Sequence, residues 1–284
     1  MIVVTGATGK IGSELVRLLA ERRETVRAVS RQIRPGEALP GVERVAADLA
    51  QREGLRPVFD GADRLFLLTA NSDDMVRLQK NALEAARQAG VKHVVKLSAL
   101  GASDHSQSVI GLWHYNVEWL LRQSGLAWTI LRPHHFMDNL LDQSESIARE
   151  GAVHSAAGEG RIPFIDTRDI AASAAVALTA SGHEGKTYVL TGPEALSYRQ
   201  ATEILSKVLG RPLAYVADTE DETWARQRQA GEPPWRIAAL LALASYQRAG
   251  GATEQVTDTV EQLTGRRPYT LEQFARAHAA AFRR

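Results

Sequence analysis

The sequence contains no cysteine, so disulfides, thiolate metal sites and cysteine nucleophiles are excluded. It also lacks an excess of charge of either sign, because 34 lysines and arginines stand against 33 aspartates and glutamates. This balance argues against a protein that binds nucleic acid or an anionic membrane through bulk charge. We therefore expect neither kind of partner, although a local basic site stays open.

Long apolar runs are missing as well. The longest apolar stretch, around Ile237 to Ala244, is far too short to span a bilayer. The first residues, Met-Ile-Val-Val-Thr-Gly, have neither the basic region nor the cleavage site of a signal peptide. Together with the absence of cysteine, these features lead us to expect a cytoplasmic protein.

Short apolar runs alternate with helical patterns through the first half of the 284 residues. Helices are predicted at about 75–89 and 112–123, and a further helical pattern follows the first apolar run. Strands are predicted at residues 2–4, 25–29, 42–46, 65–68, 94–97 and 128–131. Strands that alternate with helices in this way predict a parallel sheet covered on both faces, which is a Rossmann-type, doubly wound α/β fold.

The second half is less regular. It predicts short strands at 162–165, 188–190 and 213–216, and helices from Thr167 or Asp169 to about Ala180 and from Ser197 to about Leu209. We expect residues 1–150 to form the Rossmann domain, with contributions from about 151–192. Residues 193–284 would form a smaller, mostly helical C-terminal cap that shapes the substrate site.

A glycine-rich loop directly follows the first predicted strand. Residues 6–12, Gly-Ala-Thr-Gly-Lys-Ile-Gly, spell G-x-x-G-x-x-G. In a dinucleotide site the first glycine turns off the strand, the second admits the pyrophosphate and the third lets the helix pack closely. A tight turn without ligand is the alternative, but the strand-to-helix context favours a dinucleotide. The pyrophosphate-binding residues would be Gly6, Thr8, Gly9, Lys10, Ile11 and Gly12.

The end of the second strand indicates which dinucleotide is bound. An NAD-preferring site usually has an acidic residue about 20 residues past the glycines. Here the strand ends Ala28-Val29-Ser30-Arg31, without an acid. Arg31 and Ser30 can bind a 2′-phosphate instead, with Lys10 and Arg34 adding positive potential. We expect NADP(H) to be preferred over NAD(H); a solvated Arg31 is the alternative.

Several motifs together identify a family. The chain resembles the NmrA-like atypical short-chain dehydrogenases/reductases, close to bacterial NAD(P)H-dependent quinone, azo-dye and triphenylmethane-dye reductases. The motifs that carry this resemblance run over nearly the whole length. They are residues 4–12, 98–102 (Ser-Ala-Leu-Gly-Ala), His114 with Glu118, 128–133 (Trp-Thr-Ile-Leu-Arg-Pro), 136–139 (Phe-Met-Asp-Asn), Asp166, 169–171 (Asp-Ile-Ala) and 188–192 (Tyr-Val-Leu-Thr-Gly).

The resemblance implies a cofactor cleft at the carboxyl ends of the strands, which is where an open α/β sheet binds ligands in any case. Asp48 and Leu49 would lie beside the adenine, and Leu68 and Thr69 beside the adenosine ribose. The positions nearest the nicotinamide and its ribose would be Ser98, Ala99, Pro133, His135 and Phe136.

The chain departs from related enzymes at the residues that handle protons. Typical short-chain dehydrogenases use Tyr-x-x-x-Lys, but Tyr115 is followed four residues later by Trp119. Reductases of lignan and isoflavonoid type have a lysine four residues before a glutamate. Here His114 stands four residues before Glu118, so that lysine chemistry is in doubt.

A reductase of this kind needs a proton for the anion that hydride addition creates, and histidine titrates near neutral pH. The candidates are His114, His134 and His135. His114 and Glu118 share a helix face, so Glu118 could orient His114, or the two could be an ordinary helical pair. Ser98 could bond a substrate oxygen or only a ribose hydroxyl. No third ligand stands near His134 and His135, so we expect no metal, and nothing suggests a flavin.

We therefore expect an NAD(P)H-dependent oxidoreductase that passes hydride to a flat, electron-poor acceptor such as a quinone, an azo dye or a triphenylmethane dye. The alternative is an NmrA-type redox sensor that binds dinucleotide without turnover. An epimerase or dehydratase acting on a sugar nucleotide would need the missing Tyr-Lys pair. The partner would be a small aromatic molecule, and a homodimer stays open.

Overall fold

The computed structural model describes residues 1–33 and 38–283. The chain divides into two compact units, and each draws on separate stretches of sequence. Unit 1 comprises Met1–His105, Ile110–Pro133 and Arg168–Val189; unit 2 comprises Ser106–Val109, His134–Thr167 and the described residues from Leu190 onward. None of the helices in these ranges is long and apolar enough to cross a membrane.

A seven-stranded sheet forms the centre of unit 1, in the order β3-β2-β1-β4-β5-β6-β8. Strands β1 to β6 pair in parallel, each with its neighbour in that order. The strands are β1 (Ile2–Thr5), β2 (Val26–Ser30), β3 (Val42–Ala46), β4 (Arg64–Leu67), β5 (His93–Leu97), β6 (Ala127–Pro133) and β8 (Lys186–Leu190). The order reverses between β1 and β4, which is the position where doubly wound sheets bind ligands. The Rossmann-type fold is confirmed.

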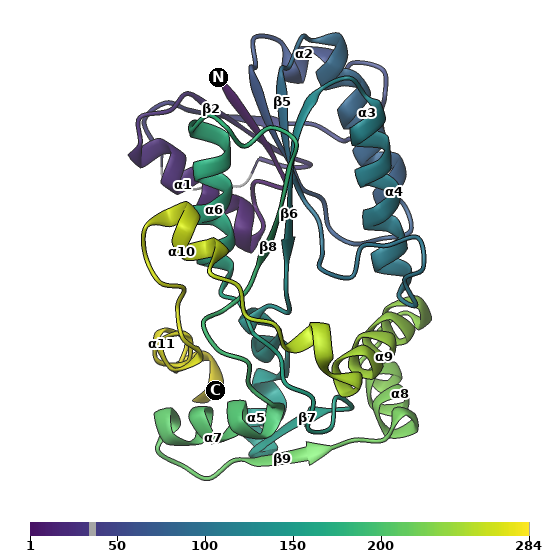
Figure 1. The fold of residues 1–284 in the computed structure, drawn as a ribbon, viewed down its shortest axis with the longest axis vertical. Helices are drawn as coiled ribbons and strands as arrows, with labels where there is room; N and C mark the ends of the chain where they lie inside the picture. Colours follow the sequence, from purple (N-terminus) through teal and green to yellow (C-terminus); the bar gives the residue numbers. More distant parts are fainter. Residues whose placement is uncertain (34–37, 284) are drawn as a thin grey trace. The chain divides into compact units, whose positions relative to one another are not determined.

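Helices cover both faces of this sheet. Helices α1 and α6 lie on one side and α3 and α4 on the other (Figure 1). Helix α1 packs because Ile11, Leu15 and Leu19 recur at helical spacing and are buried. The helices of unit 1 are α1 (Lys10–Glu21), α2 (Arg56–Phe59), α3 (Met75–Gln88), α4 (Val109–Gln123, whose first residue belongs to unit 2) and α6 (Thr167–Thr179, likewise).

Unit 2 is mostly helical around a two-stranded parallel sheet, β7 (Ala152–Ser155) with β9 (Ala214–Ala217). Helix α7 (Tyr198–Leu209) begins at Ser197, whose hydroxyl accepts the Gln200 N–H, and it ends at Gly210 in the left-handed region. The other helices are α5 (Ser144–Glu150), α8 (Glu220–Gln229), α9 (Pro234–Ala249), α10 (Thr259–Thr264) and α11 (Leu271–Ala277), with 3-10 turns η1 (Met137–Gln143), η2 (Gly251–Glu254) and η3 (Ala281–Arg283).

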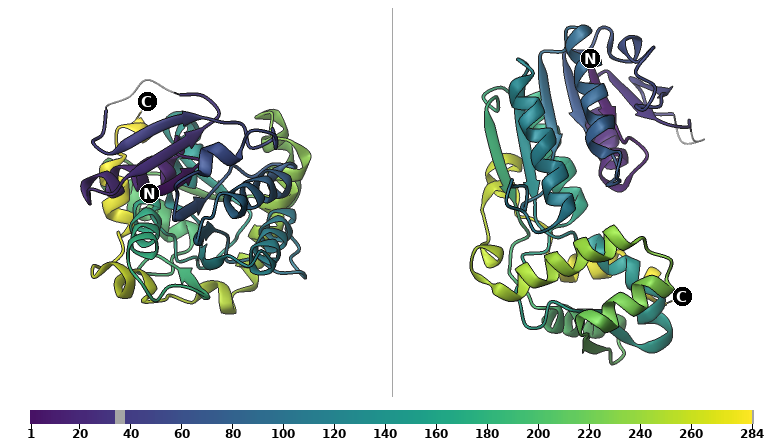
Figure 2. Two further views of the ribbon diagram at one scale, coloured as in Figure 1. Left: turned by 90° about the horizontal axis from the view of Figure 1, so that it is seen from above. Right: turned by 90° about the vertical axis from the view of Figure 1, so that its right-hand side faces the viewer.

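The two units have separate hydrophobic cores, and Figure 2 shows their elements from two further sides. Phe59, Leu65 and Leu121 belong to the core of unit 1, while Phe164 and Phe274 belong to that of unit 2. The prediction of a strand at residues 162–165 was wrong. Ile162 bridges Leu196 and Ile165 bridges Phe136, and single bridges to two different segments make no continuous ladder.

Candidate functional site

The glycine loop lies between β1 and α1, at the carboxyl edge of the sheet. Gly6 has a φ of 63°, which disfavours residues with a side chain. A Cβ on Gly12 would come within 2.2 Å of the Gly6 carbonyl oxygen, so only glycine lets the helix start so close to the loop. Gly9 caps α1 without a side-chain hydrogen bond, and the first turn of α1 has no acidic residue. The first N–H groups of α1 therefore suit an anion.

A hollow of about 420 Å³ lies beside this loop, between α1 and the strands β2 and β3. Its lining includes Thr8 from the loop, Ser13 from α1, Ser30 from β2 and Arg44 from β3. Arg31 is exposed and is not part of the lining. Arg44 was missed in the sequence, where it lies in a strand pattern rather than at a strand end. The predicted Arg34 lies outside the described residues.

The Ser30 hydroxyl donates to the Gln32 carbonyl at 2.7 Å, so its proton holds the turn after β2. The predicted positions after β3 and β4 also lie at the carboxyl edge of the sheet. The Asp48 carboxylate accepts the Ala50 N–H at 2.9 Å, and the Thr69 hydroxyl accepts from Gln79 at 2.8 Å. The Leu68 N–H donates to the Thr5 hydroxyl, which ties the ends of β1 and β4 together.

A buried charged cluster lies below the end of β5 and includes the predicted Ser98. The Ser98 hydroxyl donates to Glu118 Oε1 at 2.6 Å. Glu118 on α4 is 0% exposed, and Arg132 on β6 donates to both its oxygens at 2.9 and 2.6 Å. Arg122, one turn further along α4, lies 3.1 Å from Oε2. Because the Ser98 proton points to Glu118, the Ser98 oxygen is left to accept hydrogen bonds.

His114 has a different partner from the one its spacing suggested. Its Nδ1 lies 3.1 Å from Nζ of Lys96, a residue of β5 that is 0% exposed. Lys96 also donates to the Leu97 carbonyl. Neither alternative for the pair is seen in the described part of the chain: the Glu118 oxygens bond Ser98, Arg132 and Arg122, and no hydrogen bond or ion pair joins Glu118 to His114. Burial, and then the Lys96 charge, lower the pKa of His114 well below its usual value.

Unit 2 contains the other two predicted histidines, both with ring nitrogens occupied by neighbours. His134 Nε2 lies 2.9 Å from the Thr253 carbonyl, and its Nδ1 accepts the His135 N–H at 2.7 Å. His135 Nε2 lies 3.0 Å from the Tyr198 hydroxyl. Burial lowers the pKa of His134 to about 4 and that of His135 to about 3. Both rings are therefore neutral at pH 7. Phe136 pairs with Ile165 beside them.

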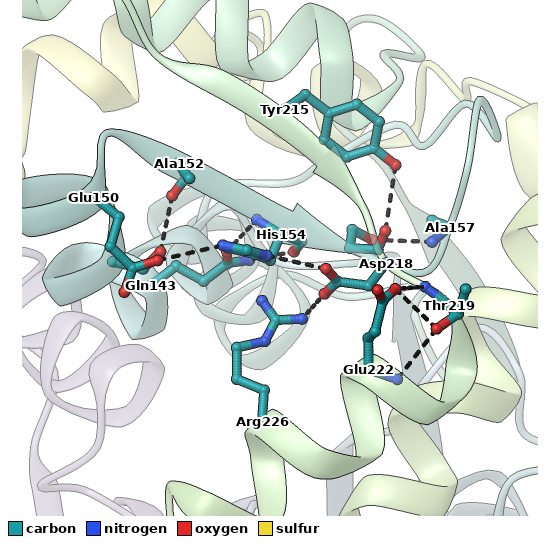
Figure 3. A network of polar contacts seen from close by, with 12 residues as sticks. Gln143, Glu150, Ala152, His154, Ala157, Tyr215, Asp218, Thr219, Glu222 and Arg226 are labelled. Atoms are coloured by element: carbon teal, nitrogen blue, oxygen red, sulfur yellow. Dashed lines mark hydrogen bonds and ion pairs between the residues drawn. The ribbon is translucent and has the colours of Figure 1, made fainter.

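A second polar network in unit 2 was not predicted (Figure 3). His154 on β7 has its Nδ1 3.0 Å from Asp218 Oδ1 and its Nε2 3.6 Å from Glu150 Oε2. Arg226 on α8 forms an ion pair with the other oxygen of Asp218. The network joins α5, β7, α8 and the end of β9. Within residues 1–33 and 38–283, no three His, Asp or Glu side chains are grouped so that they could hold a metal ion.

Comparison with known proteins agrees with this geometry. A model of the NmrA-like family matches residues 1–231. The chain belongs to the NmrA-like family. It is 40% identical over 287 residues to the NAD(P)H azoreductase of Xenophilus azovorans, with 99% of each chain covered.

Two solved structures have the same fold over the whole chain. The NADPH-dependent quinone oxidoreductase of Escherichia coli, complexed with NADPH, has a TM-score of 0.89 and 28% identity, covering 99% of this chain and 100% of that one. The triphenylmethane reductase of Citrobacter sp., complexed with NADP(H), has a TM-score of 0.86 and 26% identity, covering 98% and 100%. The family resemblance drawn from the sequence motifs is confirmed.

Proposed function

We propose that this protein is an NAD(P)H-dependent reductase that passes hydride to a flat, electron-poor acceptor such as a quinone or an azo compound, with NADPH preferred. The observation that carries the proposal is the glycine loop, which ends in an α1 amino terminus with neither a side-chain cap nor an acid in its first turn. Such a terminus suits a pyrophosphate. The 40% identity to an azoreductase over nearly the whole chain supports the reaction class.

The residues that would hold the cofactor can be grouped by the part of the dinucleotide that each would contact: the phosphates, the base or the ribose. When bound, the nicotinamide supplies the hydride. Residues 6–12 would bind the pyrophosphate through backbone N–H groups, and Ser98 would accept a ribose hydroxyl hydrogen bond. The remaining predicted positions in unit 1 are Asp48, Leu49, Leu68, Thr69, Ala99 and Pro133, and those in unit 2 are His135 and Phe136.

Among the predicted proton donors, the geometry favours His114. An imidazole whose pKa is lowered by burial is neutral at pH 7 and donates from one nitrogen only. The Nδ1 of His114 is occupied by Lys96, which leaves Nε2 as the nitrogen that can carry the proton to an acceptor. His134 uses both ring nitrogens inside unit 2, so its role as a donor stays a prediction.

The preference for NADPH is assigned to Arg31 and Arg44 together. Arg31 directly follows β2, where a 2′-phosphate would lie, and Arg44 pairs in register with Ala28 of β2 and lines the hollow beside the glycine loop. Losing one charge-assisted contact of about 1.4 kcal/mol weakens binding about tenfold. We expect Arg44→Ala to lower NADPH affinity about tenfold without changing NADH affinity, measured by fluorescence titration.

Arg31→Ala tests the residue predicted from the sequence, and Arg52→Ala is a matched control because Arg52 is exposed and pairs with Glu84. Should both Arg31→Ala and Arg44→Ala leave the NADPH-to-NADH affinity ratio unchanged, this assignment of the 2′-phosphate site fails.

The reaction is tested by mixing the pure protein with NADPH and menadione or an azo dye and following absorbance at 340 nm. Saturable NADPH oxidation with either acceptor is the expected result. Tight NADPH binding with no turnover across a panel of quinones and dyes would instead support the redox sensor. The proposal also includes a substrate that is a small aromatic molecule, a cytoplasmic location and a homodimer. Residues 193–284 are proposed to shape the substrate site.

A further inference from the structure

Lys96 is the most unusual buried residue in unit 1. It lies in the middle of the sheet on β5, between Val95 and Leu97, and its side chain is 0% exposed. A buried lysine normally pairs with a carboxylate, because an ammonium ion loses its hydration in the protein interior. Lys96 has no carboxylate within ion-pair distance in the described part of the chain; its nitrogen bonds only His114 Nδ1 and the Leu97 carbonyl.

The nearest acid does not neutralise Lys96 by contact. Glu118 favours the charged lysine from a distance, but its oxygens are held by Ser98, Arg132 and Arg122. The groups that act on the Lys96 ammonium are therefore the Leu97 carbonyl on β5, His114 on α4 and, from a distance, Glu118 on α4. Burial outweighs the attraction of Glu118 and lowers the pKa of Lys96 to about 7. Lys96 can therefore gain and lose a proton near neutral pH.

The contact also fixes which nitrogen of His114 carries hydrogen. An ammonium group has only donors, so a protonated Lys96 requires Nδ1 of His114 to accept. The single proton of the neutral imidazole then lies on Nε2. Directional proton transfer needs a histidine whose tautomer is fixed, and a partner at Nδ1 fixes the proton on Nε2.

We propose that Lys96 is a positioning residue that holds His114 in the Nε2–H tautomer and replaces the proton that His114 delivers. This rests on the proposed reductase function. An acceptor that has taken up a hydride is an anion, and the Nε2 proton of His114 neutralises it. A proton of Lys96 moves to Nδ1, which keeps the imidazole neutral. Nε2 then takes up a proton from solvent as Nδ1 returns its own to Lys96, so that the pair regains its starting state.

The first test needs neither cofactor nor turnover. The ¹⁵N-labelled wild-type protein is studied by long-range ¹H–¹⁵N NMR at pH 6.5, with the His114 signals assigned from the spectrum of His114→Gln. We expect the Nε2–H tautomer in the wild type and a mixture containing Nδ1–H in Lys96→Met. A wild-type His114 in the Nδ1–H tautomer would overturn the proposal, even if Lys96→Met does not fold.

The second test uses the pH dependence of turnover at saturating NADPH and acceptor. The wild-type kcat should fall as pH rises through about 7, because the protonated lysine is the competent form. In Lys96→Met this limb should vanish and kcat should drop at least about tenfold, while KM for the acceptor stays within twofold. Lys92→Met, at an exposed lysine just before β5, should keep the wild-type profile.

The two proposals fail in different ways. If the wild type turns over no acceptor, the reductase function fails, and the NMR test still decides the tautomer. If Lys96→Met turns over acceptors with wild-type kcat and an unchanged pH limb, the proposal for Lys96 is overturned while the reductase function stands.

Discussion

Each unit contains a histidine in a polar network, and the two histidines have opposite partners. His114 in unit 1 is 8% exposed, and within the residues that the structure describes its polar partner is the nitrogen of a buried lysine. His154 in unit 2 has a side chain that is 17% exposed and lies between Asp218 and Glu150, with Arg226 on the far oxygen of Asp218. Among residues 1–33 and 38–283, the first histidine has a cation and no acid as a polar partner, whereas the second has two acids.

With the role proposed for His114, this difference separates a proton-transfer arrangement from a structural one. A histidine between carboxylates gains attraction when it is protonated, so it suits a role in holding segments together. In unit 2 those segments are α5, β7, α8 and the end of β9 (Figure 3). A neutral histidine beside a buried lysine has one nitrogen free to donate and a proton source behind it. The presence of a histidine with polar partners is therefore not enough to assign chemistry; the charge of the partner matters.

The largest expected effect is on catalysis. His114→Gln should lower kcat by about a hundredfold or more, because it removes the proposed general acid, and general acid catalysis contributes about 10²- to 10⁴-fold. His154→Gln should leave kcat within twofold. The measurement is NADPH oxidation at 340 nm with menadione at saturating concentrations of both.

NADPH affinity is measured on the same two variants to show that the cofactor site is intact. A His154→Gln variant that lost activity as severely as His114→Gln, with its fold preserved, would end the distinction between the two networks.

The second effect is on stability. Glu118→Gln should lower the free energy of unfolding by about 3 kcal/mol, since removing one partner of a buried ion pair leaves the others uncompensated. Asp218→Asn should cost less, about 1–2 kcal/mol, because the Asp218 side chain is 6% exposed and pairs with one arginine, whereas that of Glu118 is 0% exposed and pairs with two. Urea unfolding at pH 7 measures both. Equal losses, or a larger loss for Asp218→Asn, would contradict the view that burial makes the unit 1 cluster the more sensitive one.

The sequence predicted unit 1 better than unit 2 for a physical reason. Strands β1 to β6 are short apolar runs separated by helices, and parallel pairing with right-handed crossovers leaves few arrangements for them. In unit 2 the pairing of β7 with β9 joins residues about 60 apart, and β7 itself has only four residues. No local pattern in Ala-Val-His-Ser indicates that partner.

The candidate site was predicted only in part. The glycine loop and His114 could be found because spacing along one loop or one helix carries their signal. Lys96 was missed because the contact joins β5 to α4, and sequence spacing does not say which side chains of a strand meet a helix. A signal was present: Lys96 is the one charged residue inside the run Val94-Val95-Lys96-Leu97, which otherwise predicts a strand buried on both faces.

The smallest expected effect concerns the pKa of His154. Burial lowers this pKa first and the charge of Arg226 lowers it further, while Glu150 raises it. Arg226→Met should therefore raise the pKa of His154, as followed by NMR titration. Arg248→Met, which removes a partly exposed arginine paired with Glu220, should leave it unchanged.

The sign of the linked stability change follows from the direction of that pKa. The pKa of His154 is below 6.5 in the folded state, so the unfolded state binds more protons as pH falls through 6.5. His154 therefore lowers the free energy of unfolding on acidification. Above about pH 7.5 it contributes nothing, because the ring is neutral in both states. In Arg226→Met this acid-dependent loss should shrink by about 0.5 kcal/mol or less between pH 7 and 5, because the ring is partly exposed. If the loss instead grows, the carboxylates of Glu150 and Asp218 do not hold the protonated ring, and His154 resembles His114 more closely than its partners indicate.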